Sequence, residues 1–325
     1  MYTNFPLVSI IIPTYNQADY LIFSIESCLK QTYKNIEVIV IDDGCTDNTS
    51  EILDKYSTKI KIIKQNNQGA AMALNNGIKI ASGSLIGWLS SDDAYLPYKI
   101  EYQVKQFIDD PLLDVSYTDW YSIDKAGNIL LEVKSPHYTS NFLQNFLFGN
   151  FINGSSVIMK KTVWEEVGGF NTALVADVDG YMWYSLLLKG KSFGHIPKTL
   201  IYYRTHSQNQ SSNMPLMRFY SDKVICEMLQ KIPDNLLNPN NGTQGIYIFY
   251  KNYIKHLHKC FFWNSALLVS TRMYQIKPSI LNKLHISIIK LLIKIFEDGN
   301  YSNFQIRALF RLRSIVLKSF HKKKN

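Results

Sequence analysis

The stretch LVSIIIPTYN, residues 7–16, is a run of apolar residues that ends in turn-forming polar residues. Continuous apolar runs of this length are typical of strands buried on both faces of a parallel sheet. The pattern recurs in IEVIVIDDG (36–44), KIKIIKQ (59–65) and SLIGWL (84–89). We therefore predict four buried strands at the start of the chain.

Helices are expected between these strands. Residues 18–31 place apolar side chains at helical spacing, residues 45–57 begin with capping candidates, and residues 69–83 end at a glycine. This alternation predicts an α/β fold with a mostly parallel, Rossmann-like sheet flanked by helices. Farther along, we predict strands at 115–123 and 155–161 and helices at 141–151 and 162–170. Beyond about residue 214 the chain changes to long apolar-basic helices, which predicts a domain of residues 1–214 and a basic helical region of residues 215–325.

Composition places the chain among globular proteins, with 46% hydrophobic and 19% charged residues. The four cysteines have no metal-binding spacing and are expected to be reduced thiols. The N-terminus is expected to be a first strand and not a signal peptide, and no segment is apolar over about 18 residues, the length a membrane span requires.

Most of the net charge of +9 lies in residues 281–325. That region is expected either to meet an anionic membrane surface or to pack on the catalytic domain or on another subunit of a homo-oligomer. Motifs for binding nucleic acid are absent from the sequence.

Polar clusters follow three of the predicted strands. They are Thr14-Tyr15-Asn16, Asp42-Asp43 and Asp92-Asp93. Ligands of open α/β sheets bind beyond the carboxyl ends of the strands, so these clusters predict one site. Neither GxGxxG nor GxxxxGK[ST] occurs, so a glycine cradle for phosphates is not expected. Two adjacent carboxylates instead suit Mg²⁺ or Mn²⁺, which commonly sits between carboxylates and substrate phosphates.

Several stretches together resemble the family 2 glycosyltransferases, which have a GT-A fold. They are VSIIIPTYNQADYL, TYKNIEVIVIDDGCTDNT, NNQGAAMALNNGIKIASGSLIGWLSSDD, GGFNTALVADVDGYMW and YYRTHSQNQS, in the order of the family. They cover residues 7 to about 213. The resemblance implies a GT-A catalytic domain with a nucleotide-sugar half (1–94) and an acceptor half (95–214).

The resemblance also implies roles for individual residues. Asp43 is expected to accept the N3–H of a uracil-type base, and Asp92 to approach the ribose. Asp93 and His206 are expected to ligate Mn²⁺ or Mg²⁺, while Arg204 and His206 close over the diphosphate. The full nucleotide-binding set is Pro13, Thr14, Tyr15, Asn16, Asp42, Asp43, Asn75 and Asp92.

A general base is needed because an attacking hydroxyl must lose its proton. The family places an Asp four residues before a Trp after GGF, and in this sequence that residue is Asp179, before Trp183. Val178 and Gly180 depart from the family pattern, so Asp177 stays open as the alternative. A purely structural role, as the N-cap of a helix, suits Asp177 better than Asp179.

The implied function is an inverting glycosyltransferase. It would move a sugar from a nucleotide-diphosphate sugar, with a UDP-sugar favoured, to a hydroxyl of a cell-surface glycan or lipid-linked oligosaccharide. Such chemistry belongs to polysaccharide, capsule or lipopolysaccharide synthesis, in the cytoplasm or peripherally on the inner face of the plasma membrane. The alternatives are a metal-dependent nucleotidyltransferase with a related sheet and a non-enzymatic adaptor. PTYNQADY lacks the basic glycine-rich loop that the first alternative requires.

Overall fold

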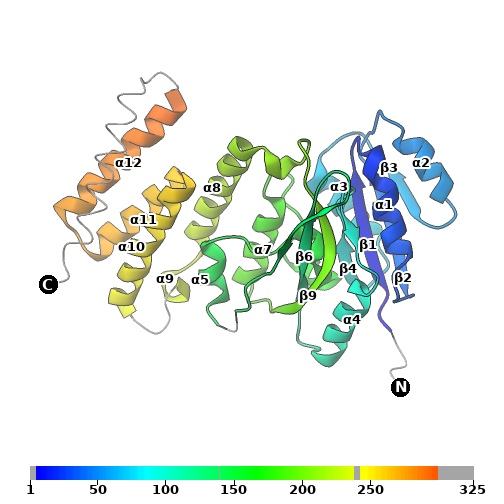
Figure 1. The fold of residues 1–325 in the computed structure, drawn as a ribbon. Helices are drawn as coiled ribbons and strands as arrows, with labels where there is room; N and C mark the ends of the chain where they lie inside the picture. Colours follow the sequence, from blue (N-terminus) through cyan, green and yellow to red (C-terminus); the bar gives the residue numbers. More distant parts are fainter. Residues whose placement is uncertain (1–4, 139, 238–241, 299–325) are drawn as a thin grey trace. The chain divides into compact units, whose positions relative to one another are not determined.

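The structure is a computed structural model, and it describes residues 5–138, 140–237 and 242–298 (Figure 1). The chain divides into two compact units. One comprises residues 1–142 and 149–212, and the other comprises residues 143–148 and 213–325. The first unit carries a nine-stranded sheet with flanking helices, and the described part of the second is helical. The predicted α/β fold with a C-terminal helical region is confirmed.

The first half of the sheet is parallel, as predicted. Its strands lie in the order β3-β2-β1-β4, and every neighbouring pair is parallel. Their bounds are β1 Val8–Thr14, β2 Ile36–Asp42, β3 Lys61–Lys64 and β4 Leu85–Trp88. Because parallel strands end at the same edge, the polar residues after β1, β2 and β4 are brought together there.

The second half of the sheet is mixed and continues β4 in the order β8-β6-β9-β5, with β7 beside β6. β6 and β9 are parallel, whereas β4 with β8, β6 with β8, β6 with β7 and β5 with β9 are antiparallel. The bounds are β5 Ala94–Tyr95, β6 Val115–Ile123, β7 Ile129–Val133, β8 Ile158–Lys160 and β9 Phe193–Arg204. The sequence did not predict β5, β7 or β9.

Helices cover both faces of the sheet. Ile10 and Ile12 share a buried cluster with α1, α2 and α4, whereas Ile11 faces α3. A Cβ at Gly77 would lie 2.5 Å from Cγ2 of Ile11, so glycine lets α3 lie directly on β1. The bounds are α1 Ala18–Leu29, α2 Thr49–Tyr56, α3 Ala70–Ile80, α4 Lys99–Asp109, α6 Lys161–Glu166 and α7 Val178–Leu188, with short 3₁₀ turns at Gly154–Ser156 and Gln210–Ser212.

The second unit is a stack of helices in its described part. Its helices are α5 Phe142–Leu147, α8 Met214–Lys231, α9 Asp234–Leu237, α10 Gly242–Cys260, α11 Trp263–Ile276 and α12 Ile280–Asp298. α11 packs against α8, α10 and α12. Over the described residues, every helix is too short or too polar to cross a bilayer.

Candidate active site

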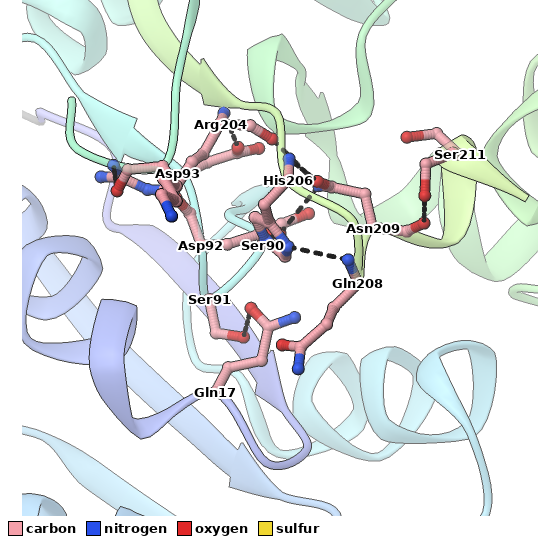
Figure 2. A network of polar contacts seen from close by, with 12 residues as sticks. Gln17, Ser90, Ser91, Asp92, Asp93, Arg204, His206, Gln208, Asn209 and Ser211 are labelled. Carbon is pink, nitrogen blue, oxygen red and sulfur yellow. Dashed lines mark hydrogen bonds and ion pairs between the residues drawn. The ribbon is translucent and has the colours of Figure 1, made fainter. Parts of the chain in front are cut away.

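The turn that follows β9 lies against the two carboxylates that follow β4 (Figure 2). Asp92 is 7% exposed, and its Oδ2 lies 3.0 Å from Nε2 of His206. Nδ2 of Asn209 donates to the same oxygen at 3.1 Å. Residues more than a hundred positions apart therefore meet at the predicted edge of the sheet.

Burial raises the pKa of Asp92 above its ordinary value, and the hydrogen bond from His206 partly opposes this. The ring of His206 is held in place by Tyr20 of α1, on which it stacks with centroids 4.9 Å apart. The backbone N–H of Gln208 donates to Nδ1 of His206 at 3.3 Å. The other ring nitrogen, Nε2, is the one that faces Asp92.

Asp93 is fully buried and is bonded on both carboxylate oxygens. Oδ1 accepts from the backbone N–H of Arg204 at 2.9 Å, and Oδ2 accepts from the hydroxyl of Ser155 at 2.6 Å. Burial, and then the negative charge of Asp92, raise the pKa of Asp93 well above its usual range. Its carbonyl oxygen also accepts from the hydroxyl of Ser24 at 2.6 Å. The structure thus places Asp93 inside the fold, with Asp92 between it and the turn after β9.

Arg204, the last residue of β9, donates hydrogen bonds from its side chain to main-chain carbonyls on two sides of the site. Its Nε donates to the carbonyl of Asp92 at 2.9 Å, and Nη1 donates to the carbonyls of Asp124 and Lys125 at 3.2 and 3.1 Å. The guanidinium lies over the ring of Tyr20, 4.9 Å from its centroid. The side chain is 5% exposed. In this arrangement Arg204 shapes the Asp92 turn, and its expected contact with a diphosphate stays a prediction.

The residues expected at the nucleotide base lie after β1 and β2. Oδ1 of Asp43 accepts from Nε2 of Gln65 and from the N–H of Gln68, and Oδ2 accepts from the N–H of Gly69, at 2.8–2.9 Å. A carboxylate offers about four lone-pair sites, so one is left for the N–H of a base. Asp42 is occupied by its own loop, since its Oδ1 accepts from the N–H of Cys45 at 2.8 Å.

The other residues expected at the nucleotide base, residues 13–16, lie beside the loop that follows β2. Asn16 has a φ of 51°, and its Oδ1 accepts from the N–H of Thr46 at 2.8 Å, which joins the ends of β1 and β2. The ring of Tyr15 is 49% exposed, whereas Thr14 is buried. Pro13 pairs with Ile41 inside the sheet. Of residues 13–16, Tyr15 and Asn16, which follow β1, are therefore the ones presented to a ligand.

Asn75 takes a role that the sequence did not predict. Its Nδ2 donates to the carbonyl of Phe170 at 2.9 Å, and its Oδ1 accepts from the N–H of Phe170 at 2.8 Å. Gly169 has a φ of 82°, and a Cβ there would lie 2.8 Å from the Asn75 oxygen. Glycine is therefore needed at this approach. Asn75 fixes the turn that leads into α7, and its expected contact with a nucleotide stays a prediction.

The two candidate bases stand at the start of α7. Asp177 immediately precedes the helix with a φ of 57°, and Asp179 lies in its first turn. Burial raises the pKa of Asp179. The pKa of Tyr203 in β9 is raised by burial and also by the charges of Asp93, Asp92 and Asp179. The charges of all three carboxylates therefore act on the phenol of Tyr203, so Asp179 lies in the same electrostatic environment as Asp92.

Several residues of the site were missed from the sequence. They are Tyr20, Ser24, Ser155 and Asn209, whose contacts with His206, Asp93 and Asp92 are described above. Serine, asparagine and tyrosine are common on surfaces, and these four come from α1, the 3₁₀ turn Gly154–Ser156 and the turn after β9. Tyr20 and Asn209 had a local signal, because they lie within the stretches VSIIIPTYNQADYL and YYRTHSQNQS.

A divalent cation fits the donors at this turn. Oδ2 of Asp92 and Nε2 of His206 lie 3.0 Å apart, and burial disfavours the negative charges of Asp92 and of its neighbour Asp93. Mn²⁺ and Mg²⁺ are commonly held by one or two protein groups together with substrate phosphates and water. Within the described ranges, three or more His, Cys, Asp or Glu side chains nowhere gather to hold a metal. The protein groups alone would therefore form an incomplete coordination shell.

Known proteins share both the sequence pattern and the fold. The model of the family "Glycosyl transferase family 2" matches residues 9–166. An uncharacterized glycosyltransferase of Rickettsia typhi is 37% identical over 264 residues, covering 77% of this chain and 82% of that protein. The chain belongs to glycosyltransferase family 2. The resemblance found in the sequence is therefore confirmed.

Solved structures extend the likeness to the whole fold of this family 2 member. Staphylococcus aureus TarS 1–349 in complex with UDP-GlcNAc aligns with a TM-score of 0.56 and 18% identity, covering 91% of this chain and 93% of that one. The mannosyltransferase PcManGT of Pyrobaculum calidifontis, in complex with GDP-Man and Mn²⁺, aligns with a TM-score of 0.58 and 17% identity, covering 99% and 89%. Three further Rickettsia glycosyltransferases are longer, and the chain spans 56%, 31% and 36% of their lengths.

Proposed function

We propose that this chain transfers a sugar from a nucleotide-diphosphate sugar to an acceptor hydroxyl, with inversion at the anomeric carbon. The observation that carries the proposal is the contact between Asp92 and His206 at the carboxyl edge of the sheet. In the proposal this pair would hold a cation at the edge of the sheet where α/β folds bind nucleotides. Two proteins of similar fold, TarS and PcManGT, have structures in complex with UDP-GlcNAc and with GDP-Man and Mn²⁺, respectively.

In this proposal Asp92 and His206 hold the cation, and Asp93 supports Asp92 from inside the fold. The sequence favoured Asp93 as the metal ligand. Both of its oxygens accept protein hydrogen bonds, however, and its side chain has no exposed surface. When bound, Mn²⁺ or Mg²⁺ would stabilise the charge that develops on the departing diphosphate. Arg204 would keep the Asp92 turn in register through its bonds to backbone carbonyls.

Asp179 is proposed as the general base. A carboxylate whose pKa is raised by burial is a better proton acceptor near neutral pH than an ordinary one. A carboxylate oxygen of Asp179 would take the proton of the acceptor hydroxyl as that oxygen attacks the anomeric carbon. The nucleoside diphosphate leaves from the opposite face of the sugar, which inverts the configuration. Asp177, at the N-cap position, is proposed to set the start of α7.

The donor is proposed to be a UDP-sugar. Asp43 keeps about one acceptor position for the N3–H of a uracil-type base, and Tyr15 presents an exposed ring at the same edge. The acceptor is proposed to be a hydroxyl of a cell-surface glycan or a lipid-linked oligosaccharide. GDP-sugars would compete for the same diphosphate site, so the base contacts decide between the two.

A donor screen tests the proposal. UDP-, dTDP- and GDP-sugars are added to the protein with Mn²⁺ or with EDTA, and the melting temperature is measured. A nucleotide sugar that raises the melting temperature only with Mn²⁺ is the expected result. If none of them stabilises the protein with either addition, the proposed donor site is wrong.

The base is tested separately with two matched substitutions. Asp179→Asn should remove transfer while donor binding persists, because the amide cannot accept the proton and the diphosphate contacts are untouched. Asp177→Asn should keep transfer, because asparagine also tolerates the left-handed backbone of this position, where φ is 57°. The assignment is reversed if Asp177→Asn is inactive and Asp179→Asn is active. Polarimetry or NMR of the product then reports its anomeric configuration.

A further inference from the structure

α12, Ile280–Asp298, has two different long faces. On one face Asn282, His285, Ile289 and Leu292 are no more than 1% exposed, and this helix packs on α11. Burial of that face accounts for the folding of the helix into its unit. The opposite face carries side chains that contribute nothing to that packing.

Large apolar side chains form a line along the exposed face. Ile280 is 87% exposed, Leu284 is 48% exposed and Leu291 is 43% exposed. Spacings of four and seven residues keep these three side chains on one side of a helix. Isolated exposed apolar residues are ordinary on protein surfaces, but a line on one helix face is typical of a docking surface.

Lysines form a second line directly beside the first. Lys283, Lys290 and Lys294 are exposed, and their spacings of seven and four residues give them one direction as well. At 100° per residue this line lies about 60–100° from the apolar one, on the side away from the buried face. The acidic residues of α12 are confined to its last two positions, Glu297 and Asp298. The exposed face is therefore an apolar stripe with a cationic border.

We propose that this face of α12 docks on an anionic phospholipid surface. The leucines and isoleucine would enter the boundary between headgroups and acyl chains, and the lysines would meet the lipid phosphates. α12 cannot act as a span, because the described helices include none long and apolar enough. The sequence beyond it adds basic residues of the same sign and no acidic ones, namely Arg307, Arg311, Arg313, Lys318, Lys322, Lys323 and Lys324.

The positive charge of this face favours an anionic lipid surface over a second copy of the chain as its partner. A two-fold contact of this face with itself would bring two lysine lines together, and like charges in contact repel. The two carboxylates of α12, Glu297 and Asp298, follow the last of these lysines at the end of the helix. An anionic bilayer supplies the missing negative charge. The proposal does not rest on the proposed transferase activity, because membrane binding is measured without donor or acceptor.

The test is vesicle co-sedimentation of the full chain. Vesicles of phosphatidylcholine alone are compared with vesicles that also contain phosphatidylglycerol, at low and high salt. The first variant, Lys290→Gln with Lys294→Gln, removes charge from the face. The second, Leu284→Gln with Leu291→Gln, removes its apolar surface. The control, Leu112→Gln, changes a leucine that is 83% exposed in the other unit, next to Asp109 and Asp110.

The wild type and Leu112→Gln should bind the anionic vesicles and release them at high salt. The lysine variant should bind about 30-fold more weakly, because each lysine near an anionic surface contributes about a factor of five, or ~1 kcal/mol. The leucine variant should fail to bind the anionic vesicles even at low salt, while its circular dichroism spectrum stays that of the wild type. The proposal is overturned if both variants bind like the wild type. It is equally overturned if the leucine variant changes only the sedimentation coefficient of the protein without lipid, which would assign the face to a second copy.

Discussion

Asn209→Leu tests whether the turn after β9 sets the geometry of Asp92 and His206. Leucine has nearly the size of asparagine but cannot form its hydrogen bonds. The substitution removes the bonds from Nδ2 to Oδ2 of Asp92, at 3.1 Å, and to the carbonyl of Arg204, at 2.9 Å. It also removes the acceptor of the backbone N–H of His206. Asp92 would then keep only His206 as a side-chain partner on Oδ2, while His206 would still be held by Tyr20 and by the N–H of Gln208.

The size of the effect follows from the bond to Asp92. A hydrogen bond to a charged group contributes about 1.5–3 kcal/mol, and the half-buried position of Asn209 places it near the lower end, at about 1.5–2 kcal/mol. That corresponds to a decrease of about 10- to 30-fold in kcat/KM for the donor. Because Asn209 aligns the cation site and does not touch the acceptor, we expect the change mainly in KM for the donor and in the concentration of Mn²⁺ needed.

The assay is the release of nucleoside diphosphate, followed over a range of donor and Mn²⁺ concentrations. Gln208→Ala is the matched control, because its side chain is exposed and its backbone N–H keeps the bond to Nδ1 of His206. Thermal melting confirms that both variants are folded. If Asn209→Leu and Gln208→Ala have the same kcat/KM and the same Mn²⁺ requirement, the alignment role is refuted.

Three further predictions concern the core of the first unit. Gly77→Ala should lower the free energy of unfolding by about 1–3 kcal/mol in chemical denaturation, because its Cβ would press on Ile11; an unchanged midpoint would contradict the packing of α3 on β1. Burial lowers the pKa of Lys99 well below its usual range, so the unfolded state binds a proton that the folded state lacks, and stability should rise with pH up to about 10. The melting temperature of Lys99→Met should depend less on pH than that of the wild type, and an equal dependence of the two on pH would refute this. The pKa of Asp93 is raised, so the neutral variant Asp93→Asn should melt in EDTA at or above the wild-type temperature, with the hydroxyl of Ser155 rotating to accept from the amide, while transfer falls. A lower melting temperature of the variant would show that the negative charge of Asp93 stabilises the fold.

The parallel half of the sheet could be predicted because its strands are nearly uninterrupted apolar runs. Val8, Ile10, Ile11 and Ile12 are all fully buried in β1, and this burial on both faces is what the run LVSIIIP indicates. The position of Asp92 at a strand end followed from the same pattern. Local hydrophobicity was a sufficient signal in this part of the chain.

β9 could not be predicted for a physical reason. Its sequence, FGHIPKTLIYYR, contains a proline and mixes polar with apolar residues, so it lacks a clean period of two. It is held by parallel pairing with β6, whose register shifts around Asp119. That pairing carries His206 to Asp92, 114 residues earlier in the chain, and no local pattern encodes such a contact.

The family resemblance named Arg204 and His206 but could not assign their partners. The fold directs the guanidinium of Arg204 to backbone carbonyls and turns only His206 toward a carboxylate. It also gives Asp93 a hydroxyl from Ser155, 62 residues away. Side chains of the same motif therefore separate into supporting and ligand-facing groups only after the chain has folded.

The most direct test of the account is the binding of the stabilising nucleotide sugar by titration calorimetry, in the wild type and in Asp92→Asn. If Asp92 and His206 hold the sugar diphosphate through a divalent cation, the wild type binds with Mn²⁺ and not with EDTA. Asp92→Asn should then bind weakly under both conditions, while Asp177→Asn binds as the wild type does. Equal affinity of the wild type and Asp92→Asn in Mn²⁺ would contradict the account.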